Sequence, residues 1–320
     1  MALSAEVYTE AVTLTEYAKG LPDGLARTFV ETFAKTSDLL AASMIKPAVN
    51  GAFKYERIAT LPTVAFRGLN EAGASSSGTF TLDEEGIFYM DSYIQVDRAL
   101  VDNYGMERRA RQHELKAIAM SQTMSRTIVA GDNSADPREF DGIKRRANVL
   151  NKSLFHNSAG AGGAALSLTN LDIVNRAVNG ITHWLFPYDL MAYMDAAARS
   201  PTLTNNAITQ KADELGRTVT MYQGKPILYG YEPDDSPLLT DFNEVASGGG
   251  GAVTASIYGL SLRGDRLFLI EGASFSAVDE GVIPGQPWYS THCKWDLGMV
   301  NQHPRGLARL TSVTKAAIVA

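Results

Sequence analysis

The sequence is poor in cysteine, and this excludes a fold held together by disulfides. Cys293 is the only cysteine among 320 residues, so no disulfide can form within the chain. Such a composition is typical of proteins that mature in a reducing compartment, and we expect the thiol to be structural. The amino terminus lacks the basic start and long apolar core of a secretory signal, and no apolar run is long enough to span a bilayer. We therefore expect no membrane partner.

Basic clusters are also lacking. The longest run of Lys and Arg is Lys144 to Arg146, and the formal net charge is −6. A dedicated nucleic-acid binder carries a basic patch or stripe, so the composition argues against that class. Any contact with DNA should be weak and sensitive to salt.

Catalytic signatures are missing as well. Gly224-Lys225-Pro226 lacks the spacing of a phosphate-binding loop and indicates a turn. His113-Glu114 lacks the second histidine of a zinc-protease helix, and the five histidines are too scattered to suggest a nucleophilic triad. We predict that the chain is not an enzyme, with no catalytic, cofactor-binding or metal-binding residues and no cofactor. A metal- or nucleotide-dependent enzyme stays as an alternative without motif support.

Four acidic residues gather near the middle of the chain, at Asp132, Asp136, Glu139 and Asp141. They resemble a cation-binding loop but lack the order and the central glycine of an EF-hand. A structural turn is the favoured interpretation.

What the sequence does contain is the pattern of a long hairpin. β-branched and aromatic residues predict a strand at Leu61 to Asn70, and the glycines and serines of Glu71 to Gly78 predict a mobile turn. Thr79 to Asp97 predict the returning strand, with apolar groups on both faces. A two-stranded ribbon is marginal alone in water, so the rest of the chain or a neighbouring copy must cover it. An ordinary surface hairpin is the plainer alternative.

Two helices are predicted in the first half. Apolar spacing predicts one at Gly24 to Lys46, stopped by Pro47, and a stronger one at Met106 to Ala130, ended by Gly131. The second would be about 36 Å long at 1.5 Å per residue, the width of a domain. Charged residues lie on its other side, which we interpret as a solvated or intersubunit face.

The second half indicates a further α+β unit. Residues 151–167 are small and glycine-rich, which suits a link between subdomains. Helical patterns and then strand patterns follow, the last strands at His292 to Asn301 and Ala308 to Val313. We expect the segment after about Pro284 to return to the first domain.

Together these features resemble the major capsid proteins of tailed bacteriophages with the Hong Kong 97 fold, in the subgroup without a fused scaffolding domain. The resemblance spans nearly the whole chain. The residues that carry it are Leu61-Pro62, Phe66 to Glu71, Val96-Asp97-Arg98, Ala130-Gly131-Asp132, Phe140 to Ile143, Trp295 to Gly298 and Pro304 to Leu310.

The resemblance implies an α+β fold with four parts. These are an N-terminal arm at 1–50, an extended β-hairpin or E-loop at 51–97, a peripheral domain with a spine helix at 98–151 and 285–320, and an axial domain at 152–284. In this family the hairpin lies over the adjacent subunit. An equal alternative for each candidate contact is that the side chain is simply exposed to solvent. The candidate intersubunit contacts are polar residues of the hairpin and the spine helix: Arg67, Asn70, Glu71, Arg108, Arg109 and Glu114.

The implied function is mechanical. Hexamers and pentamers of one chain would self-assemble in the host bacterial cytoplasm into an icosahedral virion capsid around double-stranded DNA. The candidate partners are a separate scaffolding protein, a portal and a decoration protein. Some family members weld subunits through a hairpin lysine, but Tyr55 to Asp97 contain no lysine, so we expect noncovalent contacts. An encapsulin-type shell that encloses cargo enzymes is the alternative with the same architecture.

Overall fold

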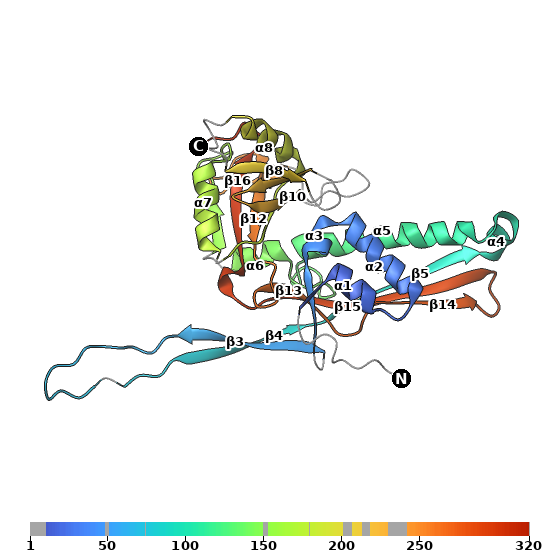
Figure 1. The fold of residues 1–320 in the computed structure, drawn as a ribbon, viewed down its shortest axis with the longest axis horizontal. Coiled ribbons are helices and arrows are strands. Elements are labelled where there is room, and N and C mark those ends of the chain that lie inside the picture. The colour runs from blue at the N-terminus through green and yellow to red at the C-terminus, as the bar shows by residue number, and fades with distance from the viewer. Residues whose placement is uncertain are drawn as a thin grey trace.

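The computed structural model describes residues 11–48, 51–73, 75–149, 153–178, 180–200, 207–212, 218–229 and 242–319. These form two lobes, each built on one sheet, and a two-stranded hairpin that projects away from both (Figure 1). A short helix, α6 (Ile143–Val149), lies where the lobes and the hairpin meet.

The first lobe is a six-stranded sheet covered by helices. Its strands are β1 (Val12–Thr13), β2 (Met44–Pro47), β13 (Leu267–Glu271), β15 (Trp288–Asn301), β14 (Ser276–Val282) and β5 (Phe88–Asp97). Its helices are α1 (Leu14–Gly20), α2 (Gly24–Thr36), α3 (Asp38–Ala42), α4 (Arg98–Tyr104) and α5 (Glu107–Ala130). β15 is the central strand of the sheet, because β5 pairs with one edge of β15 and both β13 and β14 pair with its other edge.

Strand alternation decides which face of this sheet is buried. On β5, Ile94 and Val96 point into the core, whereas Tyr89 and Tyr93 are exposed. Trp295 on β15 is completely buried, and its ring stacks on Phe33 of α2 at 5.6 Å. The helices therefore seal the inner face of the sheet.

The second lobe is an eight-stranded sheet flanked by α7 (Leu168–Ala177) and α8 (Met191–Ala198). Its strands are β6 (Leu154–His156), β16 (Leu307–Thr314), β12 (Ala252–Leu260), β7 (His183–Leu185), β10 (Lys225–Leu228), β9 (Thr218–Tyr222), β8 (Ile208–Ala212) and β11 (Glu244–Val245). Short 3-10 turns occur at Tyr188–Leu190 and Pro304–Gly306. Trp184, Phe186 and Tyr222 form the aromatic centre of this core.

The predicted spine helix is confirmed as α5, but the helix predicted at Gly24 to Lys46 is interrupted at Ser37 and is wrong beyond Ala42. Ser37 leaves the helical conformation, and its hydroxyl accepts a hydrogen bond from the Leu40 N–H at 3.3 Å, which starts α3. Met44–Pro47 then form β2, because this segment pairs with β13 in parallel and with β1 antiparallel. Sheet pairing overrode the helical spacing here.

The predicted outgoing hairpin strand at Leu61 to Asn70 is also wrong. The hairpin consists of β3 (Ala52–Thr60) and β4 (Thr79–Gly86), and pairing stops at Thr60 and Thr79. Pro62 has no N–H to extend the ladder. The described part of 61–78 is an irregular loop, in which the Ser76 hydroxyl donates to the Thr63 carbonyl at 2.9 Å. The predicted returning strand divides after Gly86, and its second part, β5, joins the first lobe.

The residues that form each sheet differ from the expected domain ranges. β13 and β14 fall within 152–284 but belong to the sheet of the first lobe, and β16 falls within 285–320 but belongs to that of the second. Of the two long strands after Pro284, β15 lies in the sheet of the first lobe and β16 in that of the second. Within the expected arm, residues 11–48 pack onto the first lobe, with Tyr17, Phe29 and Phe33 in its core; residues 1–10 lie outside the described part.

Candidate intersubunit surface and its anchor

The hairpin carries a large apolar surface that the described chain leaves uncovered. Ile58 faces Phe80 across the two strands, next to Leu82, and these three side chains are 64–67% exposed. The loop adds four more that are at least 77% exposed. We call the full set the apolar hairpin surface: Ile58, Leu61, Val64, Phe66, Leu69, Phe80 and Leu82. Apolar patches of this kind on a folded protein mark interaction sites.

The base of the hairpin is, by contrast, tied to the first lobe. Tyr55 is buried against Phe268 and Val300. Burial and the neighbouring Glu85 carboxylate raise the pKa of Tyr55 to about 12, so the phenol keeps its proton and donates to Glu85 at 3.4 Å. Arg57 donates to the Asn301 carbonyl at 2.5 Å. Only the distal part of the ribbon is therefore without cover among the described residues.

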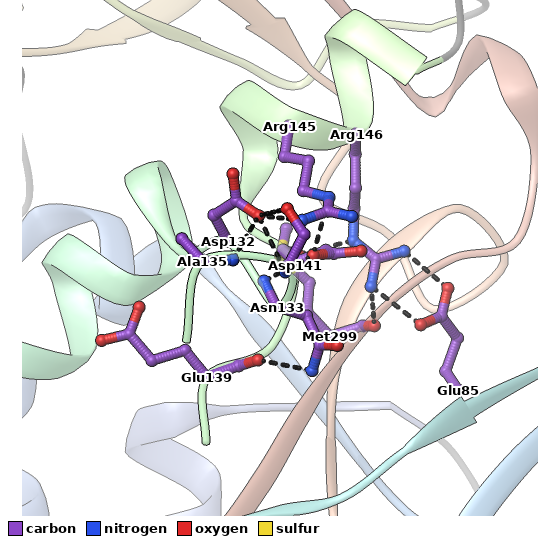
Figure 2. Close-up of polar contacts among 10 residues, drawn as sticks. Glu85, Asp132, Asn133, Ala135, Glu139, Asp141, Arg145, Arg146 and Met299 are labelled. Carbon is purple, nitrogen blue, oxygen red and sulfur yellow. Dashed lines mark hydrogen bonds and ion pairs between the residues drawn. The ribbon is translucent and has the colours of Figure 1, made fainter. Parts of the chain in front are cut away.

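Arg146 of α6 completes this attachment (Figure 2). Its guanidinium binds both carboxylate oxygens of Glu85, at 2.6 Å and 2.9 Å. It also donates to the main-chain carbonyls of Met299 at 2.8 Å and Asp141 at 2.7 Å. A two-pronged contact of this type fixes orientation as well as distance.

The acidic turn after α5 positions α6. The Asp132 carboxylate accepts from the Ser134 N–H at 2.9 Å. It also accepts from Arg145, and the Asp141 carboxylate accepts from the Asn133 N–H at 2.9 Å (Figure 2). The structural interpretation of the acidic cluster is thus confirmed for these two residues.

Two glycines allow the turn to close against the end of α5. A Cβ atom on Gly131 would lie 2.4 Å from the Phe140 carbonyl oxygen, and one on Gly142 would lie 2.7 Å from that of Thr127. Both distances are too short for any other residue. The glycines of the Ala130-Gly131-Asp132 and Phe140 to Ile143 segments therefore have a packing role.

Three of the predicted contact residues lie together in the hairpin loop. Arg67 donates to the Glu71 carbonyl at 3.1 Å, and the Glu71 carboxylate accepts from the Gly68 N–H at 2.9 Å. Asn70 has a φ of 65°, which closes this small turn. All three side chains are exposed.

The other three predicted contact residues lie on α5, and their surroundings differ. Arg108 is exposed and stacks over the Tyr104 ring at 5.1 Å, and Glu114 is exposed at the rim of a groove of about 330 Å³ between α2 and α5. Arg109 is only 6% exposed. It pairs with Asp279 of β14 and donates to the Thr291 hydroxyl at 3.1 Å, which holds the pKa of Asp279 below its usual range. Arg109 is therefore not a solvated residue of α5, and its role as an intersubunit contact stays a prediction.

The anchor residues Glu85 and Arg146 were not among the predicted contacts. The sequence feature that marks Arg146 is the run Lys144 to Arg146, and a run of cations by itself bears only on nucleic-acid binding. Its partners lie far away in the sequence, so spacing alone could not assign them.

Comparison with protein families gives a match to "Major capsid protein GP7" over residues 21–197, more than half of the chain. The chain belongs to this family. It is accordingly a structural protein of a virion capsid that associates with copies of itself, and it is not an enzyme. A search of curated proteins found no match.

Solved structures with similar folds include chains of a phage-like capsid and of an encapsulin. The encapsulin of Synechococcus elongatus, in a complex described as holo-SrpI, is 14% identical, with a TM-score of 0.62 over 88% of this chain and 89% of that one. The capsid of a native GTA particle is 11% identical, with a TM-score of 0.56 over 92% of each chain. A structure from Mycobacterium phage Bobi is 12% identical, with a TM-score of 0.57 over 89% of this chain and 90% of that one.

These likenesses establish that this capsid protein has the Hong Kong 97-type α+β fold. Among its described residues, no helix is both long and apolar enough to cross a membrane.

Proposed function

We propose that this capsid protein assembles by laying its apolar hairpin surface over a neighbouring copy, and that hexamers and pentamers made in this way close an icosahedral head around double-stranded DNA. The observation that carries the proposal is the seven-residue apolar surface on a projecting ribbon whose base alone is fixed. The first lobe would be the peripheral domain, and the second lobe the axial domain at the capsomer centre.

The energetics suit reversible assembly. Burial of a large apolar side chain is worth roughly 1.5–3 kcal/mol, so seven contribute on the order of 10 kcal/mol or more. Association costs about 4–15 kcal/mol in lost freedom. A single hairpin contact is then modest, and the closed shell gains its strength from repetition.

The shape of the subunit favours rings. The hairpin projects from one end of the molecule (Figure 1), and we propose that it lies on a surface of the neighbour other than the neighbour's own hairpin. Such a head-to-tail contact generates a closed ring when the rotation closes. Pentamers and hexamers are rings of this kind.

We expect the shell to be held by noncovalent contacts. Tyr55 to Asp97 contain no lysine, and Lys54 at the base of the hairpin pairs with Glu84 at 3.5 Å. Mature particles should therefore give one monomer band on a denaturing gel. A ladder of covalent oligomers would contradict this expectation.

The contents of the shell separate the virus from an encapsulin-type compartment. A net charge of −6 suits a shell that must release DNA. Particles purified with the neighbouring genes should contain double-stranded DNA, delivered through a portal after scaffolded assembly in the bacterial cytoplasm. Particles filled with an enzyme instead would favour the compartment. Co-purification with a scaffolding, portal or decoration protein tests those partners.

The hairpin contact is tested by Leu82→Lys and Phe80→Lys, with Thr81→Lys as the matched control. Thr81 lies between the two targets but on the opposite face of β4, opposite Arg57. Negative-stain electron microscopy should show closed shells for the wild type and the control, and dispersed subunits or capsomers for the other two variants. Normal shells from both target variants would overturn the hairpin contact.

A further inference from the structure

Helix α6 carries three consecutive cations that each bind a different part of the molecule. Lys144 pairs with Glu244 of the second lobe at 2.8 Å. Arg145 pairs with Asp132 and Asp141 of the turn after α5, at 3.0 Å for Asp141. Arg146 binds Glu85 of the hairpin. A run of cations is ordinarily exposed to solvent, but here it joins the second lobe, the turn after α5 and the hairpin.

The link to the second lobe is centred on a largely buried pair, Glu244 and Arg309. Arg309 of β16 donates to the Glu244 carboxylate at 2.9 Å and to Asn148 of α6 at 2.6 Å. Burial alone would raise the pKa of Glu244, but Arg309 and Lys144 outweigh burial and hold it below its ordinary value. Both ends of α6 are thereby held to the second lobe.

The link to the hairpin is also largely shielded from solvent on the Arg146 side. The Arg146 side chain is 10% exposed, and its bonds to the Met299 and Asp141 carbonyls fix it on the first lobe independently of Glu85. Figure 2 shows the guanidinium between the β15 carbonyl and the Glu85 carboxylate. Arg146 is therefore held in place by the first lobe, and the hairpin is attached to it through Glu85.

We propose that Arg146 is the positioning residue that sets the angle of the hairpin, and that α6 couples this angle to the two lobes. The inference rests on the proposed contact between the hairpin and a neighbouring copy. β4 is a lever about 25 Å long at 3.3 Å per residue, so a rotation of about 10° at its base moves its end by about 4 Å. An error of that size would misplace the apolar hairpin surface on its neighbour and change the curvature of the shell.

The test is Glu85→Gln, with Glu84→Gln as the matched control. The amide keeps one acceptor for Arg146 but loses the charge and the second bond. Glu84 is the adjacent residue on the opposite face, and its pair with Lys54 is exposed. Hydrogen exchange on the unassembled full chain should become about tenfold faster, or more, in β3 and β4 of Glu85→Gln, with no change in β15 or α5.

Assembly provides the second measurement. At equal folded fraction, we expect Glu85→Gln to give shells with a broader range of diameters and more open fragments in electron micrographs, and Glu84→Gln to match the wild type. Arg146→Lys keeps the charge without the two-pronged geometry, and should fall between Glu85→Gln and the wild type. A purely structural role would instead lower the melting temperature without changing the diameters.

The two proposals fail separately. Unchanged hairpin exchange in Glu85→Gln overturns the positioning role, whatever the shells look like. Faster exchange with wild-type shells also overturns it, because the angle would then not matter. If the wild-type chain formed no shells, the proposed function would fail, while the exchange comparison would still decide whether Arg146 holds the hairpin.

Discussion

The hairpin and the sheet of the first lobe contain similar residues but differ in what covers them. Trp295 of β15 stacks on Phe33 of α2 and both rings are buried, whereas Phe66 in the hairpin loop is fully exposed. Both regions alternate apolar and polar residues, so alternation predicts a strand face without telling which molecule covers it. The inner sheet face should govern folding of the subunit, and the hairpin should govern assembly.

The largest effect on subunit stability is expected at the stacked core. Trp295→Ala removes the contacts with Phe33, Tyr17 and Phe275 and should lower the free energy of unfolding by about 3–5 kcal/mol. Denaturant unfolding of the unassembled chain measures this loss. Tyr89→Ala, on the exposed face of the same sheet, should cost less than about 1 kcal/mol. Equal losses in the two variants would break the comparison.

A smaller loss is expected where α5 meets β14. Arg109→Leu removes the pair with Asp279 and the bond to Thr291, and should cost about 1–3 kcal/mol. The exposed neighbour provides the control, since Arg108→Leu should stay within about 0.5 kcal/mol. Thermal unfolding of the two variants measures the difference. Equal shifts in melting temperature would mean that the contacts of Arg109 do not stabilise the junction of α5 and β14.

A pH-dependent effect is expected at Glu271, which is buried beside Tyr17 and Trp295. Burial raises the pKa of Glu271, although hydrogen bonds from Tyr17 and Trp295 partly lower it. Because the folded pKa lies above the unfolded one, stability falls as pH rises from the ordinary glutamate value through the folded value.

Glu271→Gln should remove this part of the pH dependence. The variant should be more stable than the wild type at pH 8, and the difference should shrink toward pH 4. Urea midpoints measured across that range test the sign, with Glu280→Gln, at an exposed glutamate, as the control. A difference that grows toward acid would show that the sign is wrong.

The smallest effect on subunit stability, and a large one on assembly, is expected in the hairpin loop. Phe66→Ala should change the unfolding free energy of the unassembled chain by less than about 0.5 kcal/mol, because the ring has no cover there. Shell yield by sedimentation should nevertheless fall. A marked loss of subunit stability would show that the loop packs within its own chain.

Much of the first lobe was predictable because its pattern is local. Apolar spacing over 24 residues located α5 to within one residue of its start. The strand patterns at His292 to Asn301 and Thr79 to Asp97 located most of β15 and all of β5, but not which face of β5 is buried. Ser37 and Pro62 show the limit, since a single cap or a missing N–H moved the ends of the neighbouring elements.

The candidate site was less predictable because its contacts join distant segments. Arg109 lies on the border of the apolar stripe of α5, and its partner Asp279 is 170 residues away. Glu85 lies 61 residues before Arg146. A charged residue beside a stripe is ordinarily solvated, and nothing in its immediate surroundings indicates a partner supplied by another element.

By itself the sequence determined the spine helix, the closing strands, the turn after α5 and the absence of recognised catalytic motifs, because each depends on neighbouring residues. Only the tertiary structure decided that β3 rather than 61–70 pairs in the hairpin, that Arg109 is buried, and that Lys144, Arg145 and Arg146 bind three different parts of the molecule. The physical reason is that backbone pairing and buried charge each need a partner, and folding alone brings those partners together.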